Sequence, residues 1–207
     1  MRPRVIGGIG GIAFGVLTFV AIVISEAPGG GYSTSHIATY LSSGHRAVAI
    51  AAMYLGLLGA LGLVCLLVEL REGLAATTAG RVAWGVGIAA AASFAVGWGV
   101  LGGQIFAHLE GGKKIVIPPP VTYLLGEVGV IFIFGSAAAL LGFALIAVVL
   151  AGGGMLPGWL RWFALVAGLC GIAGPAFFTF FVLLLWAVAT GIWLLRARSP
   201  APGPTPA

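Results

Sequence analysis

Residues 47–68, AVAIAAMYLGLLGALGLVCLLV, form an apolar run of 22 residues without a single charge. A helix of about 20 apolar residues crosses the roughly 30 Å hydrocarbon core of a bilayer, because each residue adds about 1.5 Å. The charged segment ELREG, 69–73, follows where such a helix would leave the membrane. This stretch therefore predicts a transmembrane helix and places the chain among integral membrane proteins.

The composition of the whole chain agrees with this assignment. Of its 207 residues, 60% are hydrophobic and 7% are charged, whereas an average soluble domain has about 25% charged residues. A soluble globule of this composition could not cover its surface with polar groups. The net charge of +5 comes from basic residues scattered at the ends of apolar runs. This pattern is typical of loops that orient membrane proteins and argues against a nucleic-acid partner.

Further apolar runs predict an all-α, polytopic transmembrane bundle of six spans in contact with the lipid bilayer. The six runs cover residues 5–24, 47–68, 82–107, 118–150, 158–173 and 176–196. The first run follows MRPR and precedes SEA, as in a secretory signal, but it exceeds the 7–15 apolar residues of such signals. We therefore expect an uncleaved first span. Residues 1–198 are predicted to form one bundle, and 199–207, SPAPGPTPA, a Pro-rich disordered tail.

The stretch 158–196 leaves two topologies open. A continuous helix here would be about 57 Å long, and Pro175 near its middle removes a backbone donor. Two short spans with a tight connection fit, and so does one long kinked helix that gives five spans. The basic residues favour six spans with both termini in the cytoplasm. Seven are then inside and three, Arg46, Lys113 and Lys114, are outside, whereas five spans give five on each side.

Two segments carry a resemblance to a protein family. HIATYLSSGHRAVAIAAMYLGLLGALGLVCLLVELREGL, 36–74, combines a short helical loop, an Arg-containing start of a span, and a Leu-rich span that ends in a charged turn. GMLPGWLRWFALVAG, 154–168, places Pro and Trp before the last hairpin. In these features the chain resembles an uncharacterised family of bacterial six-span integral membrane proteins, and the resemblance covers most of the chain. It implies a bacterial plasma (inner) membrane and supplies no established catalytic or binding residue.

Glycines recur at spacings that suit close contact between membrane helices. Gly7, Gly11 and Gly15 repeat every four residues and predict one flat face on the first helix. Similar faces are predicted at 56–62 and 99–103. Such faces pack the helices of a bundle, or dock a partner membrane helix or a second copy of the chain.

The residues that could carry chemistry are few. The chain contains no aspartate and no nucleophile motif, which removes every Asp-containing triad and the commonest paired-carboxylate sites. Cys65 and Cys170 lie inside apolar runs and are expected to be free thiols. We therefore predict a non-enzymatic protein without a cofactor.

Three histidines fall on the predicted outer side, together with two carboxylates. His36, His45 and His108 could form a metal site with Glu26 and Glu110, because imidazole and carboxylate groups bind zinc and other divalent ions. Their spacings match no metal signature, so this site is only an alternative to ordinary loop residues in water.

Glu127 is the carboxylate that most needs an explanation, since it lies inside the apolar run YLLGEVGVIFIFG, 123–135. If this helix enters the membrane from outside near Pro119, Glu127 lies about 12 Å deep. An unpaired charge at that depth costs several kcal/mol, so such residues face the bundle or a water-filled cavity. The polar residues expected at the same end and at a similar depth are Tyr123, Gln104, His108 and Arg46.

These five residues allow two interpretations. In the first, they form an outward-facing polar pocket in which Glu127 binds a cation or a protonatable solute, so that the protein binds or passes a small solute. In the second, they form a structural hydrogen-bond network, with Glu127 neutral or paired with Arg46. The alternative function is that of a structural or accessory membrane subunit that docks a partner through its glycine faces.

Overall fold

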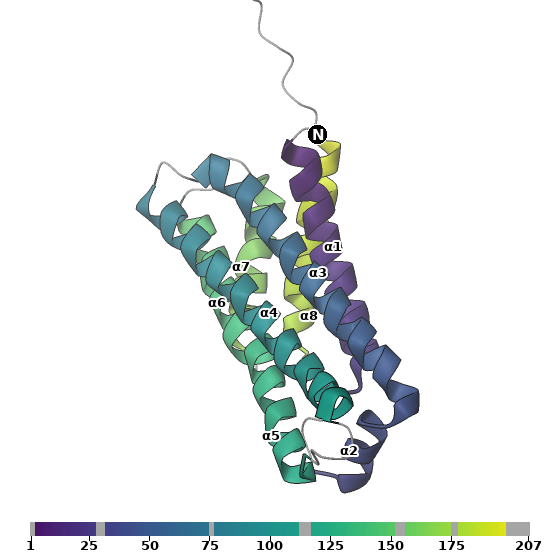
Figure 1. Cartoon of the computed structure of the whole chain (residues 1–207). Coiled ribbons are helices and arrows are strands. Elements are labelled where there is room, and N and C mark those ends of the chain that lie inside the picture. Colours follow the sequence, from purple (N-terminus) through teal and green to yellow (C-terminus); the bar gives the residue numbers. More distant parts are fainter. Residues whose placement is uncertain are drawn as a thin grey trace, which may run out of the picture.

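The computed structural model describes residues 3–27, 32–74, 77–111, 117–151, 156–174 and 178–197. Its elements are α1 (Pro3–Ser25), α2 (Thr34–Tyr40), α3 (Ser43–Leu74), α4 (Thr78–Gly111), α5 (Pro119–Val130), η1 (Ile131–Ala137), α6 (Ala138–Leu150), α7 (Gly158–Ile172) and α8 (Phe180–Arg196). They pack into one elongated helical bundle (Figure 1). Within these ranges there is no strand, so the predicted all-α class is confirmed. The predicted tail, 199–207, lies outside the described residues.

Four helices are long and apolar enough to cross a membrane. They are α1, α3, α4 and the continuous helix formed by α5, η1 and α6, Pro119–Leu150. The apolar helices α7 and α8 have only 15 and 17 residues. They are therefore about 22 and 25 Å long, less than the roughly 30 Å of a hydrocarbon core. Large apolar side chains such as Leu58, Leu61 and Phe143 are exposed on the outside, as lipid contact requires.

The segment after α6 forms a hairpin of two separate helices. α7 ends at Ile172, α8 begins at Phe180, and the two pack against each other. At Gly171 of α7, a Cβ atom would lie 3.0 Å from a methyl carbon of Leu183 in α8. The alternative of one long kinked helix over 158–196 is therefore wrong, whereas the number of spans stays a prediction.

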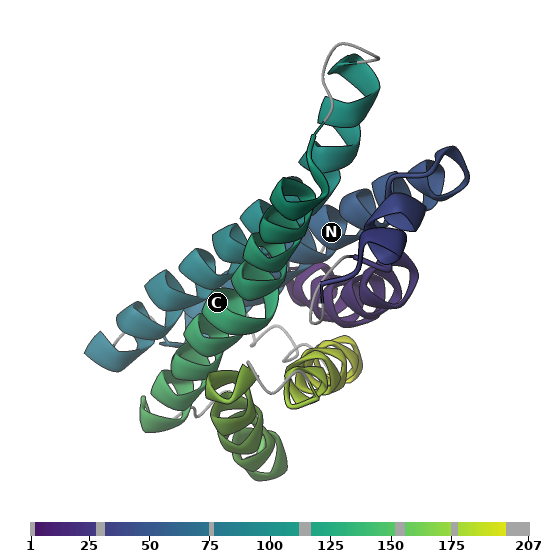
Figure 2. The same ribbon diagram turned by 90° about the horizontal axis from the view of Figure 1, so that it is seen from below.

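Helix α1 lies between α3 and α8, and glycines set how closely it approaches them (Figure 2). A Cβ atom on Gly11 would lie 2.7 Å from the carbonyl oxygen of Ala187 in α8. Gly15 also faces α8, whereas Gly7 faces Glu69 of α3. The prediction of one flat face is therefore wrong in detail. Successive steps of four residues turn by about 40° on a helix of 3.6 residues per turn, which carries the row from one neighbour to the next.

Of the two other predicted glycine rows, one packs inside the bundle and the other does not. The row 56–62 on α3 is confirmed as a packing face, since a Cβ atom on Gly59 would lie 2.5 Å from Thr18 Oγ1 of α1. For Gly99 and Gly103 the prediction of an internal packing face is wrong, because nothing lies within 4 Å of the position of a Cβ atom. Both glycines are on the exposed face of α4. It is Gly97 that faces α5, where a Cβ atom would lie 2.9 Å from the Gly129 carbonyl oxygen.

A buried aromatic cluster joins four elements inside the bundle. Phe14 of α1 packs edge-to-face on Phe94 of α4, with ring centroids 5.2 Å apart. Phe180, the first residue of α8, lies 5.7 Å from Phe94 and 4.9 Å from Phe134 of η1. Such pairs add about 0.5–1.5 kcal/mol each beyond the burial of their area. The cluster holds the start of α8 in the bundle core.

The arginines are distributed unevenly between the two ends of the bundle. At one end lie the start of α1 and the end of α8, the end of α3 with Arg71 over the Trp84 ring at 4.6 Å, and the start of α7. Five of the described arginines belong to this end, namely Arg4, Arg71, Arg81, Arg161 and Arg196. At the opposite end, where α2 lies, the described basic residue other than histidine is Arg46. Arg2, Arg198, Lys113 and Lys114 are outside the described residues.

Candidate functional site

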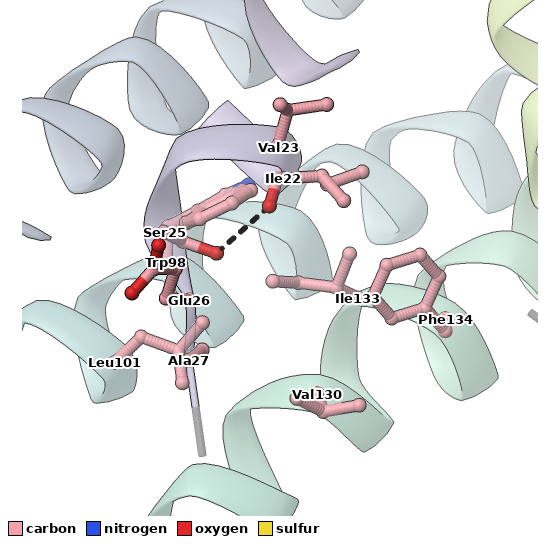
Figure 3. A pocket seen from close by; sticks show the side chains of 10 residues that line it. All are labelled: Ile22, Val23, Ser25, Glu26, Ala27, Trp98, Leu101, Val130, Ile133 and Phe134. Carbon is pink, nitrogen blue, oxygen red and sulfur yellow. Dashed lines mark hydrogen bonds between the residues drawn. The ribbon is translucent and has the colours of Figure 1, made fainter. Parts of the chain in front are cut away.

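A cavity of about 380 Å³ lies at the end of the bundle that carries α2. Figure 3 shows the side chains around it, which come from the last residues of α1, from α4, and from the α5–η1 segment. The lining residues are Ile22, Val23, Ser25, Glu26, Ala27, Trp98, Leu101, Val130, Ile133 and Phe134. Its volume falls within the range of about 300–1,000 Å³ that is usual for small-molecule sites.

The cavity exists because the α7–α8 hairpin stops short of this end. Gly174, just beyond α7, contacts the backbone of Phe134, and Phe180 packs on the Phe134 ring. Helix α1 extends beyond the tip of the hairpin, toward α2, and ends at Ser25. Helix α5, which ends at Val130, also lies beyond the tip of the hairpin. Neither α7 nor α8 lines the space that remains between them.

The π-helical turn η1 shapes one wall of the cavity. Its residues Ile133 and Phe134 are both buried and both line the cavity, although they are adjacent in sequence. A π-helical turn inserts an extra residue and changes the direction of the side chains around it, and such turns occur often at functional sites. The segment IFIFGSA, 131–137, has no sequence pattern that marks this turn.

The rim of the cavity is the carboxyl end of α1, which two histidines fasten to the next elements. Helix termini leave their last carbonyl oxygens without intrahelical donors. Here His45 Nε2 lies 3.1 Å from the Ser25 carbonyl oxygen and His36 Nε2 lies 3.2 Å from that of Glu26. Since a carbonyl oxygen only accepts, each Nε2 donates. Glu26 itself has a φ of 42°, the left-handed conformation that ends the helix.

The Glu26 carboxylate lies at the edge of the cavity (Figure 3). Its Oε2 atom is 3.8 Å from Nδ1 of His45, and its side chain is 62% exposed. In both His36 and His45 the Nε2 atom donates a hydrogen bond to a carbonyl oxygen. These two nitrogen atoms therefore cannot bind a metal at the same time. Among the described residues no group of three His, Cys, Asp or Glu side chains could hold a metal ion.

Tyr40 anchors α2 over this end of the bundle. Its buried hydroxyl donates to the Leu101 carbonyl oxygen of α4 at 3.1 Å, and its ring lies 5.5 Å from the His45 ring. Burial raises the pKa of Tyr40 to about 12. The hydroxyl therefore stays protonated and keeps donating at every physiological pH.

The five residues predicted to form a polar pocket lie at this same end, but none of them lines the cavity. Glu127 and Tyr123 form a side-chain hydrogen bond, and the Tyr123 ring lies 5.3 Å from that of Tyr32. Arg46 donates from Nε to the Leu41 carbonyl oxygen at 3.2 Å and does not pair with Glu127. Nδ1 of His108 is buried without a hydrogen-bond partner among the described residues.

Gln104 connects α4 to the backbone of α5. With the amide oriented so that both of its ends are satisfied, its nitrogen donates to the Thr122 carbonyl oxygen at 2.9 Å. Its oxygen accepts from the Gly126 N–H at 3.2 Å, and the residue is only 3% exposed. These contacts favour the structural interpretation for Gln104. A ligand-binding role for the five residues stays a prediction.

Sequence reasoning missed the cavity and the place of Glu26 in it. Glu26 was considered only with the outer histidines, because SEA at 25–27 looks like the end of a first span or signal. The cavity depends on α7 and α8 having only 15 and 17 residues, and the predicted run 176–196 did not show that α8 is this short.

Comparison of the chain with protein-family models, with curated proteins and with solved structures gave no significant match. The resemblance to bacterial six-span proteins therefore stays a prediction. The function has to be inferred from the geometry of the bundle and its cavities.

Proposed function

We propose that the chain is a six-span protein of the bacterial plasma membrane, with both termini in the cytoplasm and the α7–α8 hairpin as its last two spans. The gathering of five described arginines at one end supports this orientation, since cytoplasmic loops carry an excess of basic residues. The short hairpin fits if the bilayer thins locally beside it, at a cost of a fraction of a kcal/mol per Å.

Cysteine labelling tests this topology. In a background with Cys65 and Cys170 replaced by alanine, Ala38→Cys on α2 should react with an impermeant maleimide in intact cells. Thr78→Cys, at the start of α4, should react only after the membrane is permeabilised, because it lies at the arginine-rich end. Equal labelling of both positions from outside would contradict the proposed orientation.

The function that the geometry supports best is the binding of a small, mostly apolar cation in the cavity at the outer end. The observation that carries it is an apolar cavity of ligand size with the Glu26 carboxylate at its edge. Apolar walls favour a hydrocarbon body, and a few polar groups fix the orientation of a ligand. The Glu26 carboxylate favours a positively charged group at the mouth of the cavity. If the protein passes a solute across the membrane, binding in this cavity is the first step.

Binding of benzyltrimethylammonium to the purified chain tests this function, with neutral neopentylbenzene as a probe of the same shape. The cation should bind more tightly than the neutral probe. Glu26→Gln should weaken binding of the cation by about five-fold at most, because an exposed ion pair contributes up to about 1 kcal/mol. Val23→Trp, which fills the cavity from an exposed lining position, should remove binding of both probes.

Glu127→Gln is the matched control, because Glu127 lies at the same end but does not line the cavity. It should leave the affinity for both probes unchanged. If Glu127→Gln weakens binding of the cation and Glu26→Gln does not, the pocket around Glu127 is the binding site. If neither variant nor Val23→Trp changes binding, the proposed function is wrong.

A second candidate function is self-association through α4. One face of this helix exposes mostly Gly and Ala along most of its length, interrupted by Val96: Gly85, Ala89, Ala92, Val96, Gly99, Gly103 and Ala107. Their spacing of three or four residues is that of membrane helices that approach closely. A face of this kind can pack closely against the same face of a second copy. Gly99→Leu should then reduce a dimer to a monomer in cross-linking experiments, without the steric conflict that an internal glycine would meet.

A further inference from the structure

A second cavity, of about 260 Å³, lies at the arginine-rich end between α6 and α7. It is lined by Val149 of α6 and by Gly158, Arg161, Trp162 and Leu165 of α7. None of these residues belongs to the cavity at the outer end. We propose that this second cavity binds the phosphate headgroup of an anionic phospholipid.

Arg161 supplies the charge of the site. Its guanidinium group makes no hydrogen bond or ion pair with any residue that the structure describes, although the side chain is half-buried at the cavity wall. A guanidinium group has five N–H donors and no acceptor, and it matches phosphate oxygens with two parallel hydrogen bonds. Its donors therefore need acceptors from outside the described chain, and a phosphate group provides them.

The start of α7 adds backbone donors beside Arg161. Its N-cap residue, Pro157, forms no side-chain cap, and the first bonds inside the turn are those of the Leu160 and Arg161 amides to the Pro157 carbonyl oxygen. The preceding amides, of Gly158 and Trp159, are the ones that a helix leaves without an acceptor. Around Gly158 there is open space, with nothing within 4 Å of the position of a Cβ atom. An anion can approach these amides and the positive end of the helix dipole.

The remaining groups fit the rest of a lipid molecule. Val149 and Leu165 provide apolar walls for the upper part of an acyl chain. Trp159 and Trp162 are 57% and 71% exposed on the first two turns of α7, as tryptophans are at the boundary between hydrocarbon and headgroups. Other arginines at this end, among them Arg71 and Arg81, favour a lipid with net negative charge. The inference requires insertion in a membrane but does not depend on the ligand proposed for the outer end.

A lipid titration of the purified full chain in detergent tests the site. Added phosphatidylglycerol should raise the midpoint of thermal unfolding more than phosphatidylcholine does, and inorganic phosphate alone should leave it unchanged. Arg161→Gln should weaken the apparent affinity for phosphatidylglycerol by roughly five-fold, the factor that one basic residue contributes at an anionic lipid surface. Arg161→Lys should keep part of that affinity, because it preserves the charge but not the paired hydrogen bonds.

Two further variants separate this site from general attraction between charges. Gly158→Leu places a side chain in the mouth of the cavity without meeting the protein, so it should weaken binding while leaving unfolding without lipid unchanged. Arg81→Gln removes a charge from the same end but not from the cavity, so it should lose clearly less affinity than Arg161→Gln. Equal losses in Arg81→Gln and Arg161→Gln, no loss in Gly158→Leu, or a full response to inorganic phosphate would each overturn the proposal.

Discussion

Gly11→Leu should destabilise the bundle by about 3 kcal/mol, the upper end of the usual cost of overpacking a close-packed interior. A Cβ atom at this position would lie 2.7 Å from the Ala187 carbonyl oxygen and 3.1 Å from the Cα atom of Gly191. Both obstacles are backbone atoms of α8, which cannot move aside as the end of a flexible side chain can. The helices must therefore separate, and the contacts on both sides of the glycine are lost. Thermal unfolding in detergent, followed by tryptophan fluorescence, measures the effect.

Two control variants show whether the effect comes from the position or only from added bulk. Gly44→Leu makes the same chemical change near the start of α3, where nothing lies within 4 Å of a Cβ atom, and it should leave the unfolding midpoint nearly unchanged. Val16→Leu adds a methylene at an exposed position of α1 and should also have little effect. Small and equal shifts in all three variants would show that α1 does not pack against α8 through Gly11.

Gln104→Leu should have the second largest effect, a loss of about 1–2 kcal/mol. The substitution removes two hydrogen bonds from α4 to the α5 backbone at Thr122 and Gly126, at a site that is almost fully buried. Hydrogen bonds between membrane helices contribute about 0.6 kcal/mol on average and up to about 1.7 kcal/mol. Since α4 and α5 form two walls of the cavity lined by Glu26, the loss should also loosen that end. Hydrogen exchange of the α5 amides measures this local effect beside the global unfolding midpoint.

Thr122→Val is the matched control, because Thr122 Oγ1 is buried without a hydrogen-bond partner among the described residues. Replacing this hydroxyl by a methyl group should leave stability unchanged or raise it, since no hydrogen bond is lost and an unsatisfied polar group is removed. One other result for Gln104→Leu would support the predicted polar pocket. If Gln104→Leu leaves unfolding unchanged and removes binding of a cation, Gln104 acts on a ligand and not on α5.

The cavity lined by Glu26 lies at the end of the bundle that carries α2, and three side chains hold this end together. His45, His36 and Tyr40 donate to the carbonyl oxygens of Ser25 at the end of α1, of Glu26 just after it, and of Leu101 on α4. They fix the carboxyl end of α1, and with it the Glu26 carboxylate, beside the apolar space. The histidines that looked like metal ligands in the sequence thus position the rim of the cavity.

The order and bounds of the helices could be predicted from the sequence to within a few residues. The run 82–107 lies inside α4, Thr78–Gly111, and the run 118–150 matches the continuous helix Pro119–Leu150. The reason is that a hydrocarbon core of fixed thickness requires apolar runs of about 20 residues and excludes charges from them. The same argument divided the apolar stretch after residue 157 into two runs, because one helix over 158–196 would be much longer than that thickness.

The sequence by itself thus determined that the chain is a bundle of apolar helices, and the bounds of the long helices to within about six residues. Only the tertiary structure decided which face of each helix is buried, because lipid-facing and core-facing side chains are both apolar and leave no amphipathic period to detect. Gly11 faces α8 while Gly99 faces outward, although both look alike in the sequence. How far the α7–α8 hairpin extends along the bundle was likewise decided by the tertiary structure. It depends on the packing of Phe180 on Phe134, a contact between residues 46 positions apart. The cavity beside Glu26 exists because the hairpin does not reach the α2 end of the bundle, so no local sequence pattern could reveal it.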